Sequence, residues 1–116
     1  MCMQNPAIPE EKKLTFIFRV EPGCLGPNGD DHIESFCQFA QKEFSLINPA
    51  FLQWQIIPRE DKSLPEMEYR ISNKSLSSDR AAQYLTKFDK NIDDLEAQVQ
   101  EILVDLITDY LNGERN

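Results

Sequence analysis

Histidine, cysteine and long apolar runs are scarce in this sequence, and their scarcity excludes several classes of protein. His32 is the single histidine, so only one residue could serve as a histidine base or ligand. The three cysteines are an odd number without a CxxC pair, unlike the even, dense sets of small secreted scaffolds. No apolar run approaches the ~20 residues that span a bilayer, and the N-terminus lacks a signal-peptide pattern. We therefore expect a cytoplasmic protein without a transmembrane segment.

Basic residues are also few. The chain has 12 Lys and Arg and 20 Asp and Glu, which gives a net charge of −8. A surface of this sign repels the phosphates of nucleic acids and of anionic membranes. We expect neither as a partner. The excess of negative charge either serves solubility alone or recognises a basic protein.

The size and composition fit one small domain. The chain has 116 residues, of which 41% are hydrophobic and 28% charged, enough to fold without disulfides or a metal. Residues 1–12, with Pro6 and Pro9, have no periodicity and are expected to be a flexible leader. The domain itself is expected over 13–113, with no cofactor.

Three segments alternate apolar and polar residues as half-buried strands do. The first covers residues 14–20 and places Leu14, Phe16, Phe18 and Val20 on one face. The second covers residues 51–57, and the third covers residues 67–71. Since the second and third are joined by a short polar connection, we predict that they pair antiparallel.

Two regions have the apolar spacing of helices. The first begins after Asp30 or Asp31, either of which could be the N-cap, with Glu34 closing a capping box, and it stops at Asn48-Pro49. The second begins at Ser77 or Ser78 and has no proline or glycine before Gly113.

The second helical region is too long for its sheet. About 35 residues at ~1.5 Å each would span ~50 Å, whereas a six-residue strand spans ~20 Å. Either the helix breaks near Asp89–Asn91, which we favour, or its free end packs on another chain. The predicted fold is α+β, with a small, mainly antiparallel, three-stranded sheet, helices on one face, and the order β-α-β-β-α.

A glycine-rich loop is the first candidate site. Gly23, Gly26 and Gly29 lie between a strand and a helix, where backbone N–H groups can cradle an anion, and Trp54 could complete a small-ligand pocket. The spacing matches neither the dinucleotide nor the Walker pattern, and Asp30 and Asp31 oppose an anion. A simple chain reversal is the competing interpretation.

Cys24 and His32 are the only basis for a thiol or metal enzyme. They lie eight residues apart, Cys37 falls on the apolar stripe of its helix, and no second catalytic motif is present. We therefore expect a binding protein rather than an enzyme.

The leading hypothesis is a non-catalytic protein-interaction module. The C-terminal helical region has a long apolar stripe, and its polar positions are acidic. We predict that it binds a basic partner or a second copy of the chain through Leu95, Val99, Ile102, Leu106 and Tyr110. The self-association half of this hypothesis depends on the stripe remaining uncovered within one chain.

Overall fold

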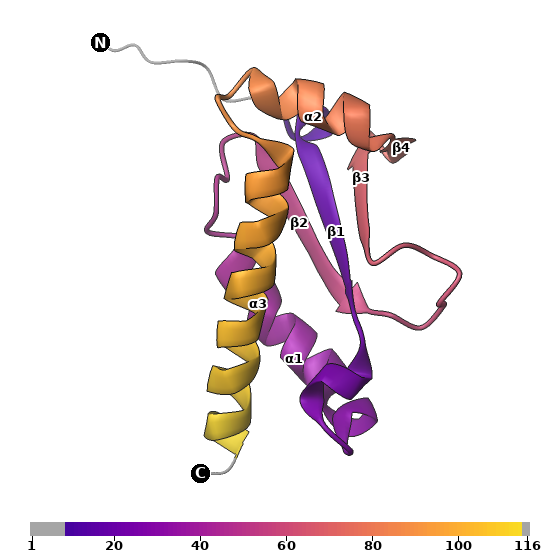
Figure 1. The fold of residues 1–116 in the computed structure, drawn as a ribbon, viewed down its shortest axis with the longest axis vertical. Helices are drawn as coiled ribbons and strands as arrows, with labels where there is room; N and C mark the ends of the chain where they lie inside the picture. The colour runs from indigo at the N-terminus through magenta and orange to yellow at the C-terminus, as the bar shows by residue number, and fades with distance from the viewer. Residues whose placement is uncertain (1–8, 115–116) are drawn as a thin grey trace.

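The computed structural model describes residues 9–114, with the side chains of Glu10 and Glu114 excepted, and these residues form an α+β fold around one mixed sheet (Figure 1). The strands are β1 (Leu14–Val20), β2 (Leu52–Pro58), β3 (Met67–Ile71) and β4 (Lys74–Leu76). The helices are α1 (Gly29–Phe44), α2 (Ser78–Thr86) and α3 (Ile92–Glu114), with short 3₁₀ segments η1 (Glu10–Lys12) and η2 (Pro22–Leu25). The strand order is β2-β1-β3-β4.

The pairing of the third strand differs from the sequence prediction. β1 and β2 are parallel, with Phe16 opposite Trp54, because α1 returns the chain to the start of the sheet. β3 then pairs antiparallel with β1 rather than with β2, which puts Tyr69 opposite Phe16. The predicted hairpin between the second and third strands is therefore wrong. The connection 59–66 is long enough to pass β1, and β1 offers a more apolar neighbour than β2 does.

The sheet also has a fourth strand, so the predicted three strands and the order β-α-β-β-α are corrected to four strands and the order β-α-β-β-β-α-α. The sheet is mixed, with two antiparallel strand pairs and one parallel pair. Ser72 and Asn73 have φ values of 53° and 67°, as in a two-residue hairpin turn of type I′. They reverse the chain so that Lys74 pairs with Ile71. The strand escaped prediction because it has only three residues and its turn contains no glycine.

One face of the sheet holds the core. Leu14, Phe16, Phe18 and Val20 are each at most 1% exposed. They pack with apolar residues of β2, β3 and all three helices in one cluster. The alternation seen in the sequence is thus confirmed as the buried side of β1.

The first helix begins earlier than predicted. α1 starts at Gly29, its N-cap is Asn28, and no side chain caps it. Asp30 and Asp31 are therefore not the N-cap but lie in the first turn, where carboxylates interact favourably with the helix dipole. The helix ends at Phe44, before the Asn48-Pro49 pair.

The break in the second helical region is confirmed. α2 begins after Ser77, whose hydroxyl accepts from Arg80 N–H, and the chain turns at Asp89, where φ is 60°. The side chain of Asn91 then accepts from the N–H groups of Asp93 (2.8 Å) and Asp94 (3.1 Å) at the start of α3. α3 continues through Gly113 to Glu114, one residue past the predicted stop.

The lower half of α3 extends past the sheet and packs on α1 and η2 (Figure 1). Tyr110 lies there with its ring centroid 5.5 Å from that of Phe36 and 5.9 Å from that of Phe39. The glycine-rich segment and the first turns of α1 therefore enlarge the platform that covers α3.

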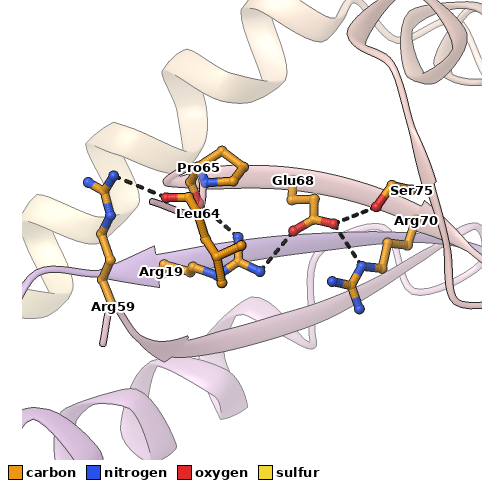
Figure 2. A network of polar contacts seen from close by, with 7 residues as sticks. All are labelled: Arg19, Arg59, Leu64, Pro65, Glu68, Arg70 and Ser75. Carbon is orange, nitrogen blue, oxygen red and sulfur yellow. Dashed lines mark hydrogen bonds and ion pairs between the residues drawn. The ribbon is translucent and has the colours of Figure 1, made fainter. Parts of the chain in front are cut away.

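The second face of the sheet carries a polar network (Figure 2). Arg19 is 5% exposed and donates to the Pro65 carbonyl and to the Glu68 carboxylate, both at 2.8 Å. Glu68 also accepts from Arg70 at 2.8 Å and from Ser75 at 2.7 Å. The network ties β1, β3, β4 and the connection 59–66 together.

The outer edge of β2 is closed by a side chain of α1. The amide of Gln41 donates to the Trp54 carbonyl (2.8 Å) and accepts from Ile56 N–H (2.9 Å), as a neighbouring strand would. Pro58, at the end of the strand, has no N–H to offer. This edge is thereby protected against strand addition.

Candidate functional site

Two of the three loop glycines are required by the backbone. A Cβ on Gly29 would lie 1.7 Å from the Pro22 carbonyl oxygen, so only glycine allows this close approach of α1 to η2. Gly26 has a φ of 93°, in the region that favours glycine. A Cβ on Gly23 would meet nothing within 4 Å. The loop is thus a compact chain reversal.

A hollow of about 790 Å³ lies beside this loop, at the carboxyl ends of the parallel strands β1 and β2. Its walls come from the segment that follows β1, the first turns of α1, and the end of β2 with the chain after it. The ionisable lining residues are Glu21, Asp30, Glu34, Arg59, Glu60 and Lys62. Carboxylates outnumber cations by four to two, which opposes an anionic ligand.

Arg59 is engaged by the protein itself. Its guanidinium donates to the carbonyls of Lys62 (3.3 Å) and Leu64 (3.1 Å) and lies 3.9 Å from the Glu21 carboxylate. The contact from Arg59 to the Leu64 carbonyl is visible in Figure 2. Because these contacts hold the guanidinium of Arg59 in the wall of the hollow, it is not available for bidentate binding of an anion.

Trp54 lies in the core instead of lining this hollow. It is 6% exposed, and its ring lies 5.1 Å from those of Phe16 and Phe44. Its indole N–H donates to the Ile47 carbonyl at 2.9 Å. The structure therefore does not bring Trp54 together with Gly23, Gly26 and Gly29 in one pocket.

Cys24 and Cys37, the two cysteines among the described residues, lack the surroundings of reactive thiols. Partial desolvation and the carboxylates of Glu66 and Glu21 raise the pKa of Cys24. Burial raises the pKa of Cys37 to about 12. A raised pKa leaves less thiolate at neutral pH, the opposite of what a nucleophile needs.

No metal centre forms within the described part of the chain, where no three His, Cys, Asp or Glu residues are placed to hold one ion. His32 lies instead beside Tyr110, with 6.3 Å between the ring centroids. The thiol or metal enzyme built on Cys24 and His32 gains no support from this geometry.

The apolar stripe of α3 packs inside the chain. Leu95, Val99 and Leu106 are 4%, 1% and 7% exposed, while Ile102 and Tyr110 are half-buried. α1, η2 and the sheet supply the cover that a second copy would otherwise have to provide. Sequence reasoning missed this because the contribution of η2 and α1 becomes visible only after folding.

The outward side of α3 is acidic along its whole length. The helix contains seven Asp and Glu residues and no Lys or Arg, which leaves the rest of the chain nearly neutral with 13 acidic and 12 basic residues. Glu96 turns inward and accepts from the Tyr69 hydroxyl at 2.5 Å. The exposed members are Asp93, Asp94, Glu101, Asp105 and Asp109.

α3 is long enough to cross a bilayer, but neither it nor any other helix among residues 9–114 is apolar enough to do so. Comparison with protein-family models, with curated proteins and with solved structures found no match.

Proposed function

We propose that this protein is a non-catalytic binding module that docks a basic segment of another protein on the acidic outer side of α3. The observation that carries the proposal is the charge distribution, since α3 holds seven of the acidic residues and no basic one. Nearly all of the net charge of −8 is therefore placed on one rigid element.

The spacing of the carboxylates favours a linear partner. Asp94, Glu101 and Asp105 are separated by seven and four residues, so they follow one line along the helix. Lys90 precedes Asp94 by four residues and lines a small hollow with it, but α3 itself contains no lysine or arginine. The positions of the carboxylates are fixed in advance because the opposite side of α3 is anchored in the core, which lowers the ordering cost of binding.

The chemistry selects the class of partner. A row of carboxylates attracts Lys and Arg side chains and accelerates association with them, and this attraction weakens as salt is added. The same row repels nucleic acids and anionic lipids. A basic protein segment is therefore the proposed partner.

The test compares two variants that remove four negative charges each. In one, Asp94, Glu101, Asp105 and Asp109 become amides. In the control, Glu11, Glu43, Glu60 and Asp79, which are exposed elsewhere on the molecule, become amides. The probe is a fluorescent peptide of alternating Lys and Ser, followed by anisotropy at low salt.

The α3 variant should bind the peptide about tenfold more weakly than the unmodified protein, equivalent to ~1.4 kcal/mol, whereas the control should lose about twofold or less. Equal weakening in the two variants would show that net charge alone attracts the peptide. That result, or no binding to the unmodified protein, would refute the proposed docking surface.

A second candidate function, binding of a small ligand, is favoured by the hollow beside η2. Its volume of about 790 Å³ is in the range of ligand pockets, and the carboxyl ends of parallel strands are a common place for them. Its excess of carboxylates favours a cationic molecule. A polyamine that raises the melting temperature, with no such effect in a Glu34→Gln variant, would support it, and an unchanged melting temperature would count against it.

A further inference from the structure

We infer that an extended segment of another protein binds along the outer edge of β2, in a groove between this strand and α1, with a lysine or arginine at the end near Pro58. This binding mode goes beyond the proposed function, because it uses a surface other than the carboxylates of α3. Three features support it, namely the hydrogen-bonding groups of the β2 edge, a continuous groove beside them, and the charge at one end of that groove.

The outer edge of β2 presents backbone groups in the pattern that a further strand uses. Gln41 donates to the Trp54 carbonyl at 2.8 Å and accepts from Ile56 N–H at 2.9 Å. In a parallel ladder, the N–H and C=O of one residue bond to two such groups, which lie two positions apart on the neighbouring strand. The amide of Gln41 therefore takes the place of one residue of a parallel strand. By the same alternation, the Leu52 carbonyl and Trp54 N–H point to this edge.

The hollows beside this edge are continuous with one another. A hollow of about 400 Å³ at the start of β2 and one of about 600 Å³ at its end share Gln41 in their walls. The second of these shares Glu34 and Pro58 with the hollow of about 790 Å³ beside η2. Together they form a groove along the outer edge of β2, which we call the α1–β2 groove. Its walls also include Cys37, Ser45, Gln53 and Ile56.

An extended segment fits the α1–β2 groove better than a compact ligand does. β2 has seven residues and is ~23 Å long, so a small molecule would occupy only one of the hollows beside it. Gln41 protects the edge against chance pairing, but it does so with two hydrogen bonds. A strand would replace both bonds and add bonds to the Leu52 carbonyl and Trp54 N–H, so it could displace the side chain.

The charge of the groove differs between its two ends. At the Pro58 end, four carboxylates outnumber the two cations, Arg59 and Lys62, and Arg59 is held by the chain after β2. At the Leu52 end, the described wall residues include Lys13 and no carboxylate. A strand parallel to β2 would bring its C-terminal residues to the acidic end, where a lysine or arginine complements the carboxylates.

The α1–β2 groove and α3 lie on different flanks of α1. The ring of Phe39 lies 5.9 Å from that of Tyr110 on α3. Gln41, which bridges the groove, follows Phe39 by two residues, or about 200° around the helix. The edge of β2 in a second copy is a poorer occupant of the groove, because its own Gln41 and α1 cover it.

The experiment uses a fluorescent peptide of eight residues, in which alternating Thr and Val are followed by two C-terminal lysines. A second peptide has the same sequence with N-methyl groups on its four central residues, which removes N–H donors but keeps the charge. The protein variants are Gln41→Ala, the double variant Glu34→Gln with Glu60→Gln, and the control Gln100→Ala, an exposed position on α3. Affinities are measured by anisotropy and masses by analytical ultracentrifugation.

The first peptide should bind at least about tenfold more tightly than its N-methylated counterpart. Gln41→Ala should raise its affinity about threefold or more, because no side chain has to be displaced, and Gln100→Ala should leave it unchanged. The double glutamate variant should weaken binding about fivefold, because the lysines lose their carboxylates.

Equal binding of the two peptides would overturn the inference, since the lysines alone would then account for the affinity. An unchanged affinity in Gln41→Ala would also overturn it, as would Gln41→Ala dimers that the peptide does not dissociate, because the edge would then accept a second copy. The variant with amides in place of the α3 carboxylates separates this inference from the proposed function. It should bind the first peptide as the unmodified protein does, and a loss of binding there would place the peptide on α3 instead.

Discussion

The hydroxyl groups of Tyr69 and Tyr110 have opposite hydrogen-bonding environments. The hydroxyl of Tyr69 donates to the Glu96 carboxylate at 2.5 Å and joins β3 to α3. The hydroxyl of Tyr110 is buried and finds no hydrogen-bond partner among the described residues. Removing the two hydroxyl groups should therefore have opposite effects on stability.

We predict that Tyr69→Phe lowers the free energy of unfolding by about 1.5–3 kcal/mol, because a hydrogen bond to a charged group is lost. Tyr110→Phe should leave it unchanged or raise it by up to ~1 kcal/mol, because an unsatisfied buried group is removed. Urea denaturation of the two variants at pH 7 makes the comparison. A loss of 1.5 kcal/mol or more in Tyr110→Phe would show that its hydroxyl is satisfied in solution.

Glu68 should make stability depend on acid pH. Hydrogen bonds from Arg70, Ser75 and Arg19 lower the pKa of this carboxyl from 4.5 to about 2. Because the folded-state pKa lies below the unfolded one, the stabilisation is complete above pH 4.5 and disappears as the pH falls through 2.

At pH 7 the Glu68→Gln variant should be less stable than the unmodified protein by about 3 kcal/mol, which is the equivalent of the pKa shift. The difference should shrink between pH 4.5 and pH 2. Urea denaturation at several pH values tests this, and a difference that stays constant down to pH 2 would show that Glu68 is not held by these contacts.

At the scale of elements, the sheet edge at β2 depends on a side chain rather than on a strand. Gln41 occupies the Trp54 carbonyl and the Ile56 N–H that a further strand would use. An exposed edge of seven residues would otherwise be a template for intermolecular pairing.

Gln41→Ala should therefore lower stability by about 1–2 kcal/mol and increase self-association, since two backbone groups lose their partners. The matched control is Gln38→Ala, an exposed position one turn earlier in α1. Sedimentation velocity over a range of concentrations supplies the readout. If both variants sediment like the unmodified protein and melt at the same temperature, Gln41 does not protect the edge.

At the scale of the whole molecule, the decisive question is what covers α3. A helix of 23 residues is about 35 Å long, whereas the seven-residue strands span ~23 Å. The difference is made up by η2 and the first half of α1, which carry α3 where it extends past the sheet (Figure 1). The stripe is thus part of the core.

Two substitutions on α3, two residues apart in sequence, test this assignment. Leu106→Glu should destabilise the chain by at least about 3 kcal/mol, because Leu106 is 7% exposed and a charge would be buried. Val104→Glu should change stability by less than about 0.5 kcal/mol, because Val104 is 61% exposed. Thermal and urea denaturation measure both. If the Leu106→Glu variant is folded and stable but has a lower solution mass than the unmodified protein, Leu106 instead lies in a subunit interface.

The local pattern of residues determined much of this fold. The alternation of β1, the stripe of α1, the Ser77 cap and the break near Asp89–Asn91 all follow from neighbours a few positions apart, and each was predictable for that reason. The acidity of α3 was equally visible, because charge needs no partner to be counted.

Tertiary structure alone decided which strands pair and which apolar residues are covered. β3 pairs with β1 and not with β2. η2 and α1 pack against the part of α3 that extends past the sheet. Both arrangements depend on contacts between residues far apart in the chain. The pattern of one segment specifies which side is apolar but not which segment will bury it. The burial of Leu106 and the exposure of Leu46 were therefore settled only by the packing of the whole chain.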